Sequence, residues 1–208
     1  YELIWAVNKP APDPSFDHYE YGGCCVADTL FMYTGGGLKS LFQTGPLVEK
    51  RRLSDGSAVW SLQSGTAPGL GGNQVFDLAV DANGLYCATV YRSDFGAENR
   101  QLEKRLLSTG AVSWGLVLNY TPVGIDIDET GIYVCGFNAQ VQKRNFTDGG
   151  LIWANTPGST KGHDIKVGFD GVYVATEYNW ASGSTGGAVE KYDKDSGALL
   201  YRVYRADM

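Results

Sequence analysis

Few side chains in this sequence have the type and spacing that catalysis needs. The clearest group is the pair His163-Asp164. The sequence contains a repeat, described below, in which Asp77 occupies the position equivalent to Asp164 in an earlier copy. An imidazole and carboxylates that meet near a channel could bind a metal ion or move protons. Only two histidines occur, and no nucleophile has a matching spacing. We therefore expect these groups to stabilise strand ends by hydrogen bonding, with ligand binding by His163 as the alternative, and we predict no catalytic residue and no metal site.

The four cysteines argue against a zinc site. Cys24, Cys25, Cys87 and Cys135 form neither a CxxC motif nor a cluster with histidine. Cys87 and Cys135 fall on neighbouring positions of equivalent strands, where they should pack as small hydrophobic groups. Adjacent residues of a strand point to opposite faces, so we expect Cys24 to face inward and Cys25 outward.

One candidate binding segment is the polar stretch YNWASGSTGG, which contains Asn179 and Trp180. Trp180 is the only tryptophan outside the repeat described below. An aromatic ring on a polar loop can stack on a sugar or on a partner's side chain. The simpler alternative is that Trp180 folds over the edge of its own sheet.

A second candidate lies at the corresponding position of an earlier repeat. Tyr91, Arg92 and Asp94 combine an aromatic ring, a guanidinium and a carboxylate. This mixture suits a polar ligand or a protein partner. The alternative is a solvated loop in which the opposite charges form a local ion pair of little energetic weight.

A repeated segment positions these residues. The segment 48–60, VEKRRLSDGSAVW, recurs at 102–114, 141–153 and 189–201. In each copy a lysine precedes an aromatic residue by ten positions and a glycine precedes it by four. Glycine reaches positive φ at low cost, so each copy predicts two strands joined by a tight turn. The residues are Lys50, Lys104, Lys143 and Lys191; Trp60, Trp114, Trp153 and Tyr201; and Gly56, Gly110, Gly149 and Gly197.

A second predicted hairpin precedes each copy, over 22–34, 75–89, 123–136 and 163–176. Apolar residues alternate along the first strand of these hairpins, which indicates one more buried face. The repeating unit is therefore four antiparallel strands over roughly 40–55 residues, the size of a propeller blade. We expect the repeated lysines to form a ring, with their stems on apolar blade surface and their ammonium groups in water.

The pattern Gly-x-Tyr-Val, followed by x-Lys-x-x-x-x-x-Gly-x-x-x-Trp, resembles the repeats of PQQ-like β-propellers. It resembles even more the short bacterial and archaeal β-propeller repeats known as SBBP, with GVYVAT (171–176) and VEKYDKDSGALLY (189–201) as the best matches. The resemblance covers nearly the whole chain and implies an all-β propeller of four-stranded antiparallel blades. Such repeats occur mostly in surface and scaffold proteins.

The adjacent pair Cys24-Cys25 is similar to the adjacent-cysteine disulfide of quinoprotein alcohol dehydrogenases, which share this type of repeat. Those enzymes resemble eight-bladed discs that are far longer than this chain, and their calcium site is not recognisable here. We therefore predict no cofactor.

We predict a single domain. Its blades should cover approximately 15–66, 74–119, 122–156 and 162–206, and residues 1–9 resemble an isolated outer strand, because LIW occurs at both 3–5 and 151–153. Two arrangements fit: a closed four-bladed disc with an extra strand, or an arc of a larger propeller. The isolated strand favours the arc.

Composition and loop placement give the functional prediction. With 17 basic and 23 acidic residues the net charge is −6, which argues against nucleic-acid partners and attraction to anionic membranes, and no apolar run is long enough to span a membrane. The irregular loops between the second and third strands of a blade, and those between one blade and the next, should share one face, the usual binding face of repeat proteins. Those loops are 35–46, 63–74, 91–101, 155–162 and 178–187.

We predict a non-catalytic extracellular or particle-surface module that recognises a protein or glycan through this loop face, or assembles with copies of itself. One alternative is a quinoprotein-like or other propeller enzyme. Another is a structural segment of a larger chain or filament.

Overall fold

The computed structural model describes residues 19–39, 44–63, 74–92, 98–138, 140–156, 161–179 and 185–204. These residues form four antiparallel sheets of four strands, and within each sheet the strands lie side by side in chain order. The first sheet contains β1 (Tyr19–Ala27), β2 (Phe31–Lys39), β3 (Thr44–Arg52) and β4 (Ala58–Gln63). The second contains β5 (Gln74–Asp81), β6 (Gly84–Arg92), β7 (Glu98–Arg105) and β8 (Val112–Leu118).

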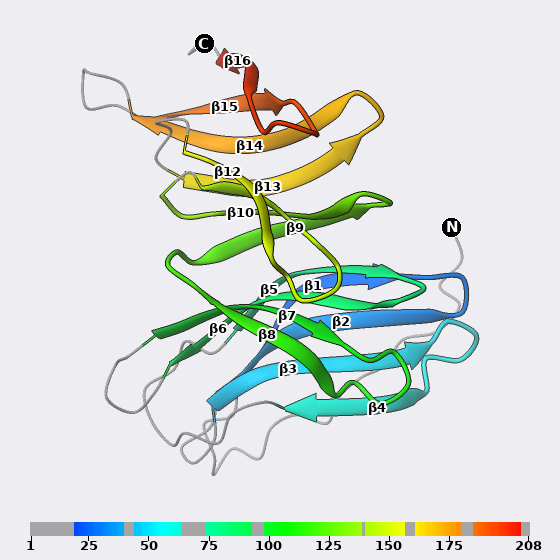
Figure 1. Ribbon diagram of the computed structural model, residues 1–208. Coiled ribbons are helices and arrows are strands. Elements are labelled where there is room, and N and C mark those ends of the chain that lie inside the picture. The colour runs from blue at the N-terminus through cyan, green and yellow to red at the C-terminus, as the bar shows by residue number, and fades with distance from the viewer. Residues whose placement is uncertain are drawn as a thin grey trace.

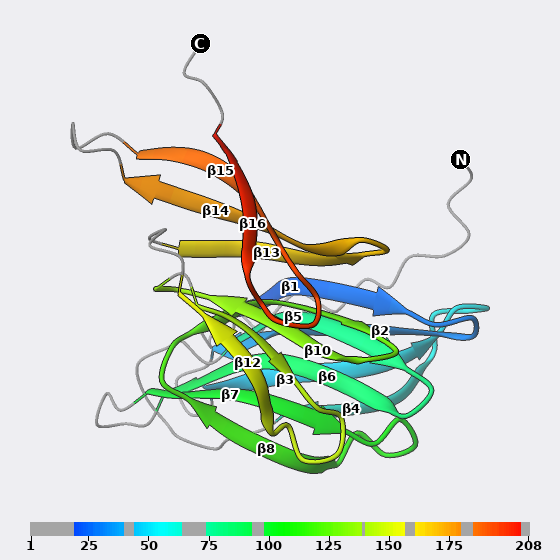
Figure 2. The same cartoon turned by 45° about the horizontal axis from the view of Figure 1, so that its top comes forward.

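The remaining two sheets repeat this plan. The third contains β9 (Pro122–Asp128), β10 (Gly131–Gly136), β11 (Val141–Arg144) and β12 (Leu151–Asn155). The fourth contains β13 (Lys161–Gly168), β14 (Gly171–Asn179), β15 (Thr185–Tyr192) and β16 (Leu199–Tyr204). The strands twist strongly, and in Figure 2 β16 lies at a steep angle to β13 of the same sheet.

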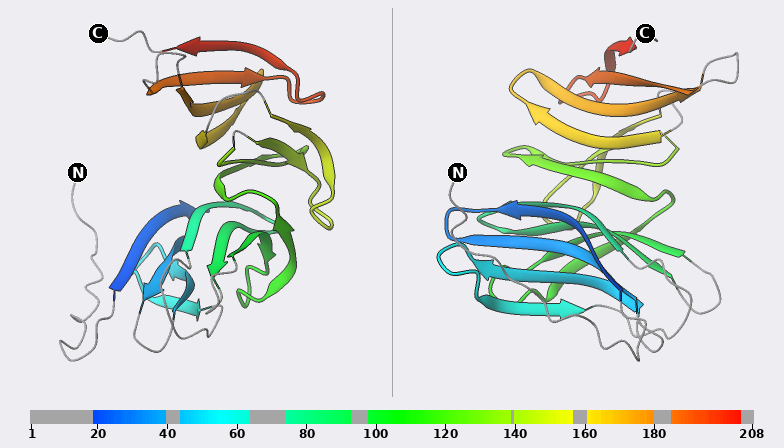
Figure 3. Two further views of the ribbon diagram at one scale, coloured as in Figure 1. Left: turned by 90° about the vertical axis from the view of Figure 1, so that its left-hand side faces the viewer. Right: turned by 180° about the vertical axis from the view of Figure 1, so that it is seen from behind.

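The four sheets radiate from a common inner edge. Strand β1 packs beside β5, β5 beside β9, and β9 beside β13, so the first strand of every sheet is innermost (Figure 1). The arrangement is that of propeller blades, which confirms the predicted all-β fold class. The described sheets form an open arc instead of a closed disc, with the first and fourth sheets at its two ends (Figure 3).

One side of the arc carries short turns of similar conformation. The four turns between the third and fourth strands each contain one glycine with a φ of 70° to 74°, a region that favours glycine. Together with the short turns between the first and second strands, they lie on the right in Figure 1. The other ends of these strands, where the second strand of each sheet ends and the third begins, lie on the opposite side. We call the two sides the turn side and the loop side, and the described strand ends agree with the predicted division.

Several loops are shorter than predicted. The expected loops over 35–46, 91–101 and 178–187 are in large part strand, because β2, β6 and β14 continue to Lys39, Arg92 and Asn179. The loop predicted to begin at residue 35 is wrong there, because the glycine-rich 35–37 segment lies within β2. Gly35 pairs with Val48 inside the sheet, and a Cβ on Gly35 would lie 2.6 Å from Val75 Cγ1 and 2.7 Å from Cys24 Sγ. Glycine here permits close packing of two sheets and does not mark a loop.

The hydrophobic core consists of three clusters, one for each pair of neighbouring sheets. Each cluster combines side chains of one sheet with side chains of the next, so a sheet is stabilised largely by its neighbours. Representative members are Tyr33, Val48 and Leu78 between the first two sheets, Tyr86, Leu102 and Ile125 between the second and third, and Tyr133, Val141 and Ile165 between the third and fourth.

Candidate functional site

The repeated lysine and tryptophan form a joint between neighbouring sheets. In each joint, the lysine Nζ and the tryptophan Nε1 of one sheet donate hydrogen bonds to the same backbone carbonyl in the glycine turn of the next sheet. The distances are 3.0 and 3.1 Å from Lys50 and Trp60 to Leu107 O, 3.4 and 3.2 Å from Lys104 and Trp114 to Phe146 O, and 3.1 and 3.0 Å from Lys143 and Trp153 to Lys194 O.

The prediction that these ammonium groups reach water is therefore wrong for Lys50 and Lys143, which are buried in the joints. Lys50 and Lys143 are only 7% and 4% exposed. Their Nζ atoms also lie 5.4 and 5.2 Å from the ring centroids of Tyr33 and Tyr133. A buried ammonium needs such partners, and the next sheet supplies the carbonyl that completes the set.

A salt bridge strengthens the joint between the third and fourth sheets. Lys194 Nζ lies 2.5 Å from Asp128 Oδ2. Partial burial by itself would raise the pKa of the Asp128 carboxyl, but the hydrogen bonds from Lys194 and Thr130 outweigh burial and lower that pKa below its usual value. The carboxylate is therefore held ionised as part of the structure.

The carboxylates of the inner strands also have structural partners. Asp77 accepts hydrogen bonds from its neighbour Leu78 N and from Ile125 N of the third sheet, both at 2.9 Å. Burial raises the pKa of the Asp77 carboxyl, although these two hydrogen bonds oppose the shift. In the same way, Asp126 accepts a 2.8 Å hydrogen bond from Val167 N of the fourth sheet. Both carboxylates connect neighbouring inner strands, which supports the structural role expected for Asp77.

The cysteines follow the sequence prediction. Cys24 packs against the core between the first two sheets, whereas Cys25 is exposed, and both Cys87 and Cys135 are buried. Burial raises the pKa of the Cys24 thiol to about 12 and raises the pKa values of the Cys87 and Cys135 thiols as well. All four thiols are free.

The loop side of the fourth sheet carries an aromatic and charged cluster. The Tyr178 and Tyr204 rings meet edge to face, with centroids 5.1 Å apart. Arg202 Cζ lies 5.3 Å from the Tyr178 centroid and 5.9 Å from the Tyr204 centroid. These two tyrosines stand at the loop ends of β14 and β16. We call Tyr178, Arg202 and Tyr204 the loop-side cluster.

A buried carboxylate, that of Glu190, holds this cluster in place. Glu190, which is fully buried, accepts a 2.6 Å hydrogen bond from Arg202 Nε and another from the Tyr192 hydroxyl. The guanidinium is thereby held beside the two rings, and its Nη1 donates a 3.3 Å hydrogen bond to the Tyr204 hydroxyl. The sequence analysis missed Arg202 and Tyr204, although the alternation of tyrosine and arginine in YRVYR (201–205) was a usable signal.

His163 lies on the innermost strand of the fourth sheet, as expected, and close to the loop side. Its Nε2 is 3.4 Å from Glu177 Oε2, and Lys161 Nζ is 3.5 Å from the same oxygen. The side chains of His163 and Lys161 are about half exposed. This charged group is solvated, and its ion pairs have little effect on stability. It places His163 on the loop side of the fourth sheet, the side that also carries the loop-side cluster.

The other predicted ligand-binding residues have different outcomes. The Tyr91 hydroxyl, at the end of β6, donates a hydrogen bond to Glu103 and accepts one from Arg105 Nη2 at 3.4 Å. Arg92 and Asn179 end their strands on the loop side, where their backbones pair with Glu98 and Thr185 of the next strand. The predicted residues Asp94 and Trp180 lie outside the described residues. Ligand binding by these positions stays a prediction.

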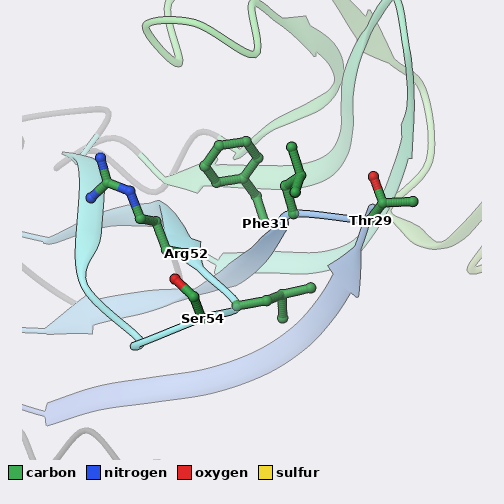
Figure 4. A pocket seen from close by; sticks show the side chains of 6 residues that line it. Thr29, Phe31, Arg52 and Ser54 are labelled. Carbon is green, nitrogen blue, oxygen red and sulfur yellow. The ribbon is translucent and has the colours of Figure 1, made fainter.

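A pocket of about 470 Å³ lies on the turn side of the first sheet (Figure 4). Its walls are the two turns of that sheet, and Leu30 at its rim is 65% exposed. Arg52, one of the lining residues, donates a 3.0 Å hydrogen bond from Nη1 to Ser57 Oγ. The pocket shows no arrangement for acid–base or nucleophilic chemistry. Its lining residues are Thr29, Leu30, Phe31, Arg52, Leu53 and Ser54.

Across the described part of the chain, no group of three or more His, Cys, Asp or Glu side chains is placed to hold a metal ion. The same residues contain no helix long and apolar enough to cross a membrane.

Comparison with known proteins finds similarity in fold alone. No family model and no curated protein matches the sequence. Among solved structures, the chain is similar to the Pan2 WD40 domain of Neurospora crassa, with a TM-score of 0.63, 10% identity and coverage of 93% of this chain and 53% of that one. U3-55K gives a TM-score of 0.64 and 12% identity, with coverage of 95% and 57%. BamB from Moraxella catarrhalis gives 0.52 and 11%, with coverage of 88% and 63%.

The chain thus spans somewhat more than half the length of these propeller structures. The comparisons support a propeller repeat fold, whereas the PQQ-like or SBBP assignment of the repeat rests on the sequence pattern.

Proposed function

We propose that this chain is a protein-recognition module that binds its partner through the loop side, near the outer edge of the fourth sheet. The observation that carries the proposal is the loop-side cluster. Two tyrosines and an arginine are held together at the rim, and Tyr204 is 37% exposed. Tyrosine and arginine dominate the binding energy of many protein interfaces, because each offers a large contact area and a directional polar group.

The rest of the described structure supports a binding role over a catalytic one. Asp77 and Asp126 of the inner strands accept backbone hydrogen bonds from the next sheet, which favours a structural role for these carboxylates. Loops carried by a rigid scaffold are the usual place for binding residues. Arg92 ends β6 on the loop side, and Trp180 follows directly after Asn179, the last residue of β14, so both predicted residues would extend the binding surface.

The test compares two aromatic residues on opposite sides of the fourth sheet. Tyr204→Ala removes a ring from the loop-side cluster. Phe169→Ala removes a fully exposed ring from the turn between β13 and β14, on the other side. Wild-type protein and both variants are immobilised, and proteins retained from the source material are quantified by mass spectrometry. A second arm measures binding of all three proteins to a glycan array.

We expect Tyr204→Ala to weaken retention of a specific protein by about tenfold or more, as for a typical interface anchor, while Phe169→Ala leaves it unchanged. Loss with Phe169→Ala alone would place the binding site on the turn side and refute the proposal. Binding to a glycan that depends on Tyr204, without a retained protein, would identify a carbohydrate-binding module instead.

A further inference from the structure

Three of the four sheets neutralise an arginine with a buried glutamate. Each of these glutamates directly precedes the repeated lysine in the sequence and is at most 8% exposed. The ion pairs join Arg51 Nη2 to Glu49 Oε2 at 3.0 Å, Arg105 Nη2 to Glu103 Oε2 at 2.6 Å, and Arg202 Nη2 to Glu190 Oε1 at 2.6 Å. A carboxylate beside a guanidinium is therefore a regular part of this repeat.

The third sheet keeps the arginine and lacks the carboxylate. Gln142 occupies the position of the glutamates, and its Oε1 accepts hydrogen bonds from Arg144 Nε and Nη2 at 2.9 and 2.6 Å. Arg144 Nη1 donates a 2.8 Å hydrogen bond to Gly149 O. These contacts match those of Arg105, but a carboxamide carries no net charge. Among the described residues no carboxylate forms an ion pair with Arg144, so its partly buried charge is not compensated.

The pKa values of the two arginines differ in the direction that this substitution requires. Burial by itself would lower the pKa of Arg105, but the Glu103 carboxylate outweighs burial and raises that pKa. Burial lowers the pKa of Arg144 below its usual value, although Tyr120 opposes the shift. The Arg144 guanidinium therefore lacks the stabilisation that an anion gives to its counterpart in the second sheet.

A second partner of the guanidinium is also missing at Arg144. In the second sheet the Tyr91 hydroxyl accepts a 3.4 Å hydrogen bond from Arg105 Nη2. The repeat aligns Tyr91 with Asn138, which is exposed and lies beyond the end of β10 with a φ of 71°. A different hydroxyl, that of Tyr120, lies close enough to Arg144 for the two groups to shift each other's pKa. This hydroxyl is buried, and in the part of the chain that the structure describes it has no hydrogen-bond partner.

We propose that Arg144 and Tyr120 form a binding site for an external carboxylate between the second and third sheets. The carboxylate would take the charge-balancing role that Glu103 has beside Arg105. Two of the five guanidinium N–H groups of Arg144 are not used by Gln142 and Gly149, and the Tyr120 O–H is a further donor. A carboxylate has acceptor sites for all three, and charge-assisted hydrogen bonds of this kind are strong.

Burial limits what can enter the site. Tyr120 and Gln142 are 1% and 5% exposed, and Tyr120 belongs to the core cluster between the second and third sheets. Arg144 is partly exposed, so the ligand approaches from the solvent side of the guanidinium. A single carboxylate group fits these limits, either as a small free acid or as the end of an aspartate or glutamate side chain of a partner protein.

The test is a titration of the 208-residue chain with sodium acetate, in which sodium chloride keeps the ionic strength constant. Nuclear magnetic resonance follows the arginine side-chain Nε–H signals, and the Arg144 signal is assigned from its loss in Arg144→Lys. We expect a saturable shift of the Arg144 signal with a Kd of about 0.1–10 mM, as for a small ligand with few atoms. The Arg105 signal should not move, since Glu103 already occupies its anion position.

Two variants test the two halves of the site. Gln142→Glu supplies the internal carboxylate of the other sheets, so it should keep the fold and weaken acetate binding by about tenfold or more. Gln101→Glu makes the same change of charge on β7 of the second sheet and should leave the affinity unchanged. Tyr120→Phe removes a hydroxyl that has no described partner, so it should preserve stability without acetate and weaken acetate binding by about threefold to tenfold.

A second arm identifies the source of the carboxylate. A hexaglutamate peptide that binds at least tenfold more tightly than acetate, at equal carboxylate concentration, would indicate an acidic segment of a partner protein. Equal binding would indicate a small free acid. An Arg144 signal that does not saturate, or unchanged affinity in Gln142→Glu or in Tyr120→Phe, would overturn the proposal.

The outcome is independent of the proposed recognition function. The variants of the carboxylate site leave the loop-side cluster of the fourth sheet intact, and Tyr204→Ala does not alter Arg144 or Tyr120.

Discussion

The joint between the first and second sheets allows a quantitative prediction at Gly110. This residue has a φ of 74°. A Cβ added there would lie 2.5 Å from Leu62 Cδ1 and 3.0 Å from Trp60 Cε3, both in the preceding sheet. Gly110→Ala therefore has two costs, one in the backbone of the turn and one in the packing of two sheets.

Each cost can be estimated. A non-glycine residue in the left-handed region costs ~1–2 kcal/mol. Overpacking a filled contact costs ~1–3 kcal/mol more. We expect Gly110→Ala to lower the free energy of unfolding by about 2–5 kcal/mol, a large fraction of the stability of a typical domain.

The assay is urea-induced unfolding followed by circular dichroism and tryptophan fluorescence. Gly187→Ala on β15 is the matched control, because φ is not positive there and nothing lies within 4 Å of the added Cβ. That variant should change stability by less than ~0.5 kcal/mol. If Gly110→Ala were as mild as Gly187→Ala, the assignment of Gly110 to a close-packed joint would be refuted.

A double variant separates the two costs. Leu62→Ala removes the nearer contacting side chain. In that background, Gly110→Ala should lose part of its packing cost and keep its backbone cost. The two substitutions should therefore be non-additive, with the double variant more stable than the sum of the single effects predicts. Simple additivity would show that only backbone strain matters at Gly110.

Three further predictions follow from the joints and the thiols. Lys143→Met should destabilise the fold by ~1–3 kcal/mol, since it leaves Lys194 O with one donor fewer and removes a buried cation from Tyr133. Urea-induced unfolding measures this loss, and a variant as stable as the wild type would contradict the role of the joint. The pKa of Asp128 is lowered on folding, so the stability that this carboxylate contributes is present above the unfolded pKa of about 4 and is lost as pH falls through the folded pKa. Asp128→Asn should therefore make the free energy of unfolding fall less steeply as the pH is lowered. An unchanged slope would argue against the Lys194 salt bridge. A thiol reagent should modify Cys25 first and the buried cysteines only on unfolding, so Cys25→Ser should remove the fast phase of the reaction. A persistent fast phase would mean that another thiol is accessible.

Much of the fold could be predicted from the sequence because the repeated information is local. The fixed distance from Lys50 to Gly56 and Trp60 defines two strands and a turn, and its recurrence defines four blades. The inward orientation of Cys24 follows from strand alternation. By contrast, the glycine-rich 35–37 segment was read as a loop, because nothing local shows that Val75, 40 positions away, packs against Gly35.

The candidate site was predicted less well. His163 was placed correctly on an inner strand, and the structural role expected for Asp77 agrees with its two backbone donors. Tyr91 was expected on a loop, but it ends a strand and its hydroxyl contacts Glu103. Arg202 and Tyr204 were overlooked, because an alternating Tyr-Arg strand does not reveal which of its faces will meet a buried carboxylate.

The sequence by itself determined the strand order, the turn positions and the antiparallel blade, since alternation and the cost of positive φ act over a few residues. Only the tertiary structure decided what the repeated lysines do. The ammonium groups of Lys50, Lys104 and Lys143 bind a carbonyl of the next sheet, a partner 51 to 57 positions away for Lys143 and Lys50. It also decided that Lys191 pairs instead with Asp170 of its own sheet. Both results depend on which surfaces meet after folding, and burial of an ammonium is favourable only where a second sheet supplies the acceptor.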